Sequence, residues 1–70
     1  MDASEWVERF ARELGAEAPD RETVERILEL AAEAAHSSQR TAAPVACWLA
    51  AAGGIPLERA LELAREIGDE

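Results

Sequence analysis

Three short interruptions, at residues 15–19, 37–41 and 53–54, divide the 70-residue chain into four segments that share one pattern. The interruptions contain glycine, proline, serine and threonine, which favour turns and helix ends. Between them, apolar residues recur at spacings of three and four, which places their side chains on one face of an α-helix. No alternating apolar pattern of the kind that a strand needs is present. The sequence therefore predicts an all-α fold, a compact bundle of about four short helices, as a single domain over residues 1–70.

The expected helices lie near residues 3–14, 21–38, 42–52 and 56–67. Each boundary carries a residue type that favours a helix end. Short polar side chains cap a first turn, glycine allows the left-handed stop, and proline is tolerated within the first turn. The residues that favour these boundaries are Asp2 or Ser4, Gly15, Asp20, Thr41, Pro44 and Pro56.

The apolar faces predict one shared core. The third segment is apolar on all sides, which is typical of a helix enclosed by its neighbours. Its Cys47 has no charged neighbour in the same helix that would stabilise a thiolate, and so we expect it to be a packed residue. A domain of this size has a marginal core, which makes docking or self-association an expected property. The residues predicted to share the core are Trp6, Phe10, Leu28, Trp48, Leu49 and Leu61.

Charge and cysteine content exclude several classes of partner. Fifteen acidic residues against seven basic ones give a formal net charge of -8, which repels phosphate backbones and anionic membranes. We therefore expect no nucleic-acid and no membrane partner. The uncharged run 41–57 is broken by two prolines and two glycines and is too short to span a bilayer. A single cysteine forms no internal disulfide, and there is no signal-peptide pattern, so the cytoplasm is the expected location.

Catalytic and metal-binding patterns are nearly absent. Glu33 and His36 have the Glu-x-x-His spacing of di-iron helix bundles, but such a site needs two of these pairs and two further glutamates. Ser37 and Ser38 follow His36 directly and so do not face it on a helix. The sequence predicts no enzyme and no cofactor. The alternative is a metal or cofactor site that two copies assemble through Glu33 and His36.

His36, Arg40 and Thr41, at the joint between the second and third segments, are the candidate partner-binding residues. His36 and Arg40 are four apart and share a face if the helix extends that far. Two interpretations stay open. Their positive charges could close the helix at the negative end of its dipole, or the planar arginine fork could bind a carboxylate or phosphate of a partner.

The segment 35–49 resembles a small uncharacterised helical domain of high-GC bacteria, found alone or after the nucleotidyltransferase domain of molybdopterin-guanine dinucleotide biosynthesis proteins. That family reads Ala-His, three variable residues, Arg-Pro-Ala-Ala-Pro-Leu, and then an aromatic and an aliphatic residue. Trp6-Val7 and Glu13-Leu14-Gly15 also resemble its opening. Thr41 stands where the family usually has proline, and Ala50 where it often has glycine. The matching or near-equivalent residues of the segment are His36, Arg40, Ala42, Ala43, Pro44, Val45 and Trp48.

The resemblance implies a helical fold and an association with molybdenum-cofactor maturation, without an activity to carry over. Together with the missing catalytic pattern, it leads to the expectation of a non-catalytic interaction or accessory domain. Its partner would be another protein or a second copy of the chain in a homodimer.

Overall fold

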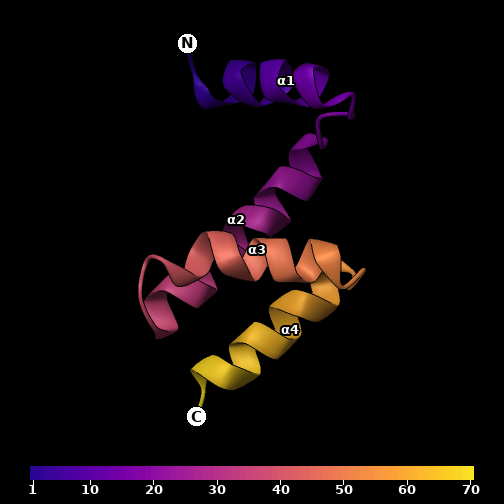
Figure 1. Ribbon diagram of the computed structural model, residues 1–70. Coiled ribbons are helices and arrows are strands. Elements are labelled where there is room, and N and C mark those ends of the chain that lie inside the picture. The colour runs from indigo at the N-terminus through magenta and orange to yellow at the C-terminus, as the bar shows by residue number, and fades with distance from the viewer.

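The computed structural model describes residues 1–70 as four α-helices without a strand, and 74% of the residues are helical (Figure 1). The predicted all-α bundle is confirmed, and every helix boundary agrees with its prediction to within one residue. No helix combines the length and the apolar content that crossing a membrane requires. The helices are α1 Ala3–Leu14, α2 Arg21–Ser37, α3 Ala42–Ala52 and α4 Leu57–Gly68.

Local signals set the ends of α1 and α2. Asp2 precedes α1 and accepts a hydrogen bond from the backbone N–H of Glu5 at 2.8 Å. Asp20 does the same for the N–H of Thr23 at 2.8 Å, so each carboxylate satisfies an amide that has no partner within its helix. Gly15 ends α1 with a φ of 71°, a left-handed conformation that costs glycine little.

The cap of α2 predicts a dependence of stability on pH. The hydrogen bond from the Thr23 backbone lowers the pKa of Asp20 below its ordinary value of 3.8. A carboxyl group with a lowered folded-state pKa stabilises the fold above its unfolded pKa, and this contribution is lost as the pH falls through the folded pKa. Asp20→Asn keeps a capping oxygen without the titration. Urea unfolding should be measured from neutral pH down to a pH below the folded-state pKa of Asp20. The unfolding free energy of Asp20→Asn should fall less steeply with decreasing pH than that of the natural chain. An equal decrease for both proteins would contradict the cap.

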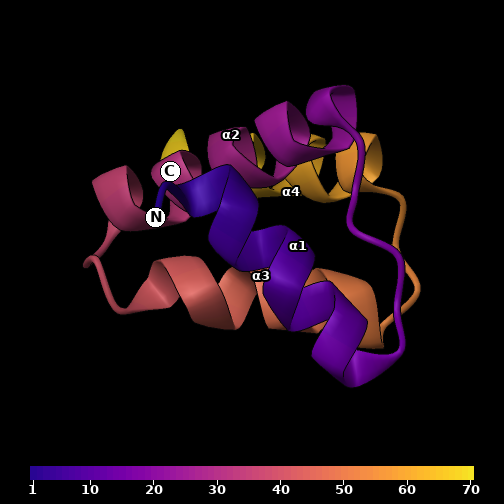
Figure 2. The same ribbon diagram turned by 90° about the horizontal axis from the view of Figure 1, so that it is seen from above.

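Helix α2 is the centre of the bundle, since both α3 and α4 pack along it while α3 and α4 scarcely approach each other. In Figure 1, α3 returns across α2, and α4 then runs in the same direction as α2. Arg65 of α4 lies 3.7 Å from the carboxylate of Glu29, and Gly68 lies beside Ser37 at the end of α2. Seen from above, α2 and α4 form one layer and α3 the other (Figure 2).

Helix α1 stands apart from this arrangement. It lies at one end of the molecule in Figure 1 and nearest the viewer in Figure 2, and it makes no extended contact with another helix. The stripe that was predicted to face the core is consequently exposed, with Trp6 at 55% and Phe10 at 47%. Only Ala11 of this helix is buried.

The predicted core is wrong for five of its six residues. Four residues are buried, one in each helix: Ala11, Leu30, Ala50 and Leu61. Of the predicted set only Leu61 is among them, whereas Trp6, Phe10, Leu28, Trp48 and Leu49 are exposed. The expectation that α3 is enclosed by neighbours is also wrong, because only α2 packs along it.

The reason lies in which side of α3 meets α2. The less exposed residues of α3 are Ala42, Ala43, Ala46, Cys47 and Ala50. The Cys47 Sγ lies 3.8 Å from the backbone carbonyl oxygen of Ile27. Small side chains let two helix axes approach closely, and so this side fits against α2 better than the side that carries Trp48. Burial raises the pKa of the Cys47 thiol, in keeping with a packed residue that stays protonated at neutral pH.

Candidate functional site

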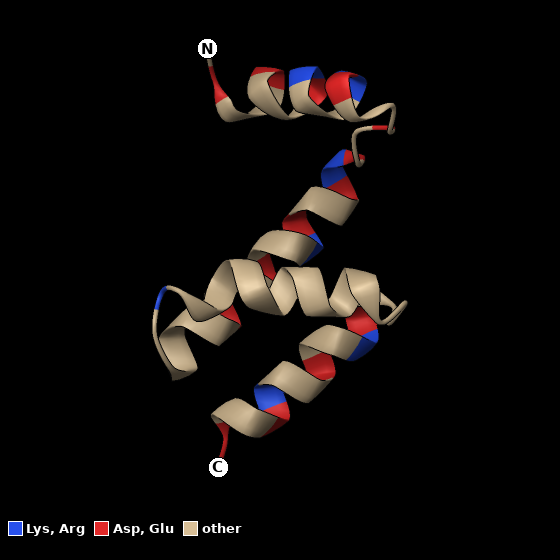
Figure 3. Cartoon of the chain, viewed as in Figure 1, with Lys and Arg blue, Asp and Glu red and all other residues tan.

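The three candidate residues predicted from the sequence lie together where α2 passes into α3. His36 is in the last turn of α2, Arg40 is in the connection, and Thr41 is the residue before α3. All three are exposed. Arg40 is the only charged residue of this connection, and the whole of α3 that follows is uncharged, as its tan colour in Figure 3 shows.

Serine hydroxyls, rather than His36 or Arg40, bond the last carbonyls of α2. Ser37 Oγ donates to the carbonyl oxygen of Glu33 and Ser38 Oγ to that of Ala34, both at 2.7 Å. Neither His36 nor Arg40 makes a side-chain hydrogen bond or an ion pair. The imidazole and the guanidinium are therefore accessible to a ligand from solution.

Thr41 does not cap α3 as expected. Its backbone is already helical, with φ -65° and ψ -18°, and its side chain makes no capping hydrogen bond. A cap needs an extended backbone to aim its oxygen at the first amides. The helical conformation instead aligns Thr41 with Val45, Trp48 and Ala52, at spacings that share one helix face. These four exposed residues form a surface that we term the α3 ridge.

The α3 ridge contains two large apolar residues that the sequence analysis did not place on a functional surface. Trp48 is 67% exposed, although it was predicted to share the core, and Val45 is 55% exposed. One signal could have found them: the opposite side of the segment is itself a continuous stripe of alanines and one cysteine. Such a stripe suits close helix packing and leaves the large side chains outside.

A second apolar surface lies between α3 and α4. Because these helices scarcely touch, they leave an open groove of about 340 Å³ with Leu30 of α2 at its base. Every residue that lines it is apolar. We term it the α3–α4 groove, and its lining residues are Leu30, Ala46, Leu49, Ala50, Ile55, Ala60, Leu63, Ala64 and Ile67.

A third apolar surface belongs to α1. The rings of Trp6 and Phe10 are stacked, with their centroids 4.9 Å apart and their planes inclined by 28°. Val7 and Leu14 continue this exposed side along the helix. We term these four residues the α1 face. A stacked aromatic pair in water is a large apolar area without a partner.

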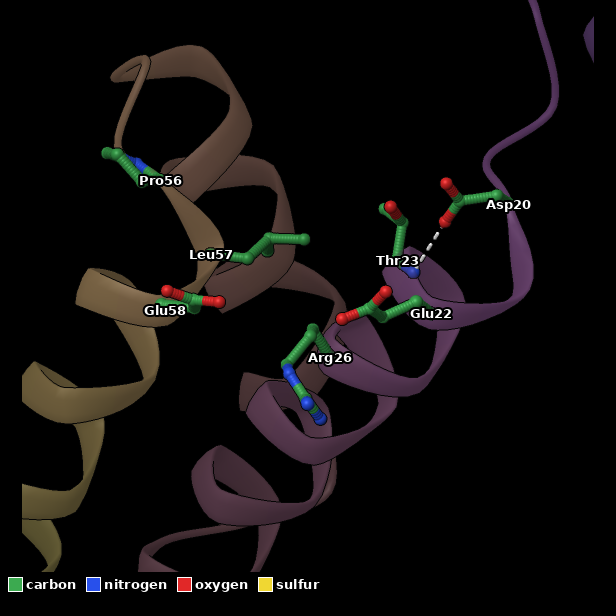
Figure 4. A pocket seen from close by; sticks show the side chains of 7 residues that line it. All are labelled: Asp20, Glu22, Thr23, Arg26, Pro56, Leu57 and Glu58. Atoms are coloured by element: carbon green, nitrogen blue, oxygen red, sulfur yellow. Dashed lines mark hydrogen bonds between the residues drawn. The ribbon is translucent and has the colours of Figure 1, made fainter.

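A polar pocket of about 240 Å³ separates the first turns of α2 and α4 (Figure 4). Two adjacent helix starts would favour an anion, but the carboxylates of Asp20, Glu22 and Glu58 line the same space. Arg26, the only cation there, is 2.8 Å from Glu29. The acidic lining opposes an anionic ligand, and so we assign none to this pocket.

The two residues of the metal-site alternative have different surroundings. The Glu33 carboxylate lies against the end of α4, close enough that a Cβ added at Gly68 would be 2.9 Å from its Oε1, whereas His36 is exposed. No three histidine, cysteine, aspartate or glutamate side chains are grouped so that they could hold a metal ion. A site assembled by two copies through Glu33 and His36 stays a prediction, which metal analysis of the purified protein would test.

Comparison with known proteins finds one family. No curated protein and no solved structure matches the chain. A domain of unknown function, DUF6457, matches residues 1–69, which include all four helices and the exposed apolar surfaces described above. The chain therefore belongs to the DUF6457 family.

Proposed function

We propose that this DUF6457 domain is a non-catalytic interaction domain, an accessory that docks on a partner protein through the α3 ridge. The observation that carries this proposal is the exposure of Trp48, at 67%, on a helix without a single charge. Tryptophan and arginine are the residue types that most often dominate binding energy at interfaces. Trp48 lies on the α3 ridge, and Arg40 lies in the connection just before it. Both side chains are exposed, so both are available as anchors.

The absence of a catalytic role is itself part of the proposal. It is supported by the surroundings of His36, the only histidine, which has no hydrogen-bonded acid or nucleophile beside it. It is also supported by Cys47, whose thiol is half-buried with a raised pKa and so is a poor nucleophile at neutral pH.

The class of partner is inferred from the resemblance at residues 35–49. That resemblance implies a family of high-GC bacteria whose members occur alone or after the nucleotidyltransferase domain of molybdopterin-guanine dinucleotide biosynthesis proteins. We propose that this domain binds a nucleotidyltransferase of that class in the cytoplasm. Arg40 would then meet a carboxylate of the enzyme, and Trp48 would enter an apolar pocket beside it.

A direct binding measurement tests this function. The purified nucleotidyltransferase from the same genome is passed over the immobilised domain. Truncation of a central anchor typically weakens binding by about 30-fold or more, so His36→Ala/Arg40→Ala and Trp48→Ala should each produce such a loss. Because these side chains are exposed, both variants should keep the helical content and melting temperature of the natural chain.

Leu28→Ala provides the matched control. Leu28 is also a large exposed apolar residue, at 61%, but it lies on α2 outside the α3 ridge. This variant should bind the enzyme normally. Undiminished binding by the folded His36→Ala/Arg40→Ala and Trp48→Ala variants, or no binding by the natural chain, would refute the proposed partner.

A further inference from the structure

The α1 face and the α3–α4 groove are both apolar, both exposed and both without a partner in a single chain. We propose that a second copy of this chain covers them, with the α1 face of each copy seated in the α3–α4 groove of the other. This inference rests on the proposed function of an interaction domain, and it assigns self-association to surfaces distinct from the α3 ridge.

The exposed area supports a dimer. A folded monomer of 7.6 kDa exposes about 4300 Å² by the usual scaling of surface with mass, whereas this chain exposes 5621 Å². The excess is about 1300 Å² per copy, or about 2600 Å² when two copies are counted. Interfaces of about 2000 Å² and more are typical of obligate homodimers. The surplus surface is thus what an intimate dimer of this chain would bury.

The helix and the groove also match in shape. At 1.5 Å per residue, the 12 residues of α1 extend about 18 Å, and the groove walls, α3 and α4, have 11 and 12 residues. An amphipathic helix in an apolar groove uses side chains about one turn apart as anchors. Trp6, Phe10 and Leu14 follow this spacing. Opposite them, Leu49, Leu63 and Ile67 line the groove.

The distribution of charge favours contact between copies through the α1 face and the α3–α4 groove. Two chains that each carry a net charge of -8 repel one another over most approaches. The run 41–57, which supplies the α3 wall and one end of the groove, carries no charge, and α3 is uncharged throughout Figure 3. The α1 face is apolar as well. Seating one on the other therefore brings no like charges into direct contact.

The connection after α1 permits the exchange. Residues 16–20 join α1 to a bundle with which it has little contact, so moving α1 onto a neighbour sacrifices few contacts. A reciprocal exchange gives two identical helix-in-groove contacts related by a two-fold axis. Closed two-fold dimers are the commonest symmetric assemblies, and exchange of an identical element is an established route to them.

Sedimentation equilibrium of the full chain tests the dimer. The natural chain should have twice its 7.6 kDa mass at micromolar concentrations. Phe10→Glu on the α1 face and Leu49→Glu in the groove should each raise the dissociation constant by about 100-fold or more, since either places a carboxylate in an apolar contact. Both residues are exposed in the single chain, so both variants should remain folded.

Arg12→Ala is the control for charge. It changes the net charge by the same single unit as Phe10→Glu, but Arg12 lies on the polar side of α1 and forms no ion pair. This variant should remain a dimer. If Arg12→Ala were monomeric, the change in net charge would explain the dissociation of Phe10→Glu as well, and the proposed contact between α1 and the groove would be overturned.

Mixing the two variants identifies which surfaces meet. Alone, a Phe10→Glu dimer has two defective helices and a Leu49→Glu dimer has two defective grooves. In the mixture, the intact α1 of the Leu49→Glu chain can enter the intact groove of the Phe10→Glu chain, which restores one of the two contacts, while the other contact carries both substitutions. A heterodimer should therefore form more tightly than a dimer of either variant alone. Contacts of helix with helix, or of groove with groove, would not be restored, and a mixture that associates no better than either variant alone would overturn the inference.

The test is independent of the proposed function. A natural chain that is monomeric at every concentration would overturn the proposed exchange of α1. This holds whether α1 closes on its own groove or another protein covers both surfaces. Binding of a partner through the α3 ridge would be unaffected. Conversely, if the chain forms a dimer but does not bind the nucleotidyltransferase, only the proposed partner protein would be refuted. Trp48→Ala, which alters neither the α1 face nor the groove, should dimerise normally.

Discussion

Leu30→Ala is expected to lower the melting temperature by at least about 10 °C and to leave much of the protein unfolded under mild denaturing conditions. Leu30 is 3% exposed on α2, the helix against which both α3 and α4 pack. Removing a buried leucine side chain typically costs about 2 to 5 kcal/mol, because contacts are lost and a cavity remains. A chain of 70 residues commonly has only about 4 to 10 kcal/mol of unfolding free energy.

Leu28→Ala is the matched control for this experiment. It makes the same chemical change on the same helix, two residues away, but at a side chain that is 61% exposed. Its melting temperature should stay within about 4 °C of that of the natural chain. The three proteins must be melted at one concentration, since self-association makes the transition concentration-dependent. Equal effects of the two substitutions would show that Leu30 is not the centre of the core.

The helices were predictable because the signals that set their ends are local. A carboxylate at Asp2 or Asp20 needs only an amide three residues later, and Gly15 needs only its own backbone freedom. None of these interactions depends on where the other helices lie. The fold class and the boundaries could therefore be derived from the sequence alone.

The core could not be predicted in the same way, because burial is decided between helices. The third segment is apolar on every side, and so its periodicity does not indicate which side meets α2. The structure selects the small side, with Ala43, Ala46 and Ala50, and leaves Trp48 outside. For α1 the predicted core position of Trp6 and Phe10 is wrong, because an apolar stripe indicates that a face favours burial without identifying the surface that buries it.

The same distinction applies to the candidate site. The sequence predicted His36, Arg40 and Thr41 as neighbouring partner-binding candidates at the joint between two helices, and all three are exposed there. The extension of that surface along Val45 and Trp48 follows from the packing of α3, which sequence periodicity does not determine. The α3–α4 groove depends on the distance between two helices and on Leu30 beneath them, and no local pattern encodes that distance.

Ala50→Leu is expected to destabilise the fold by about 1 to 3 kcal/mol, which corresponds to roughly 5 to 20 °C in melting temperature. Ala50 is 7% exposed on the small side of α3, the side that packs along α2. Three added carbons would force α3 away from α2 and open the base of the α3–α4 groove, which Ala50 also lines.

Ala51→Leu makes the same change at the next residue of α3, which is exposed. It should leave the melting temperature nearly unchanged, since an exposed substitution usually alters stability by no more than about 0.5 kcal/mol. Thermal melts followed by circular dichroism would compare the two variants directly. An unchanged melting temperature for Ala50→Leu would mean that the new side chain enters the α3–α4 groove instead of separating α3 from α2. That variant should then dimerise poorly, because the groove that receives α1 of the second copy would be filled.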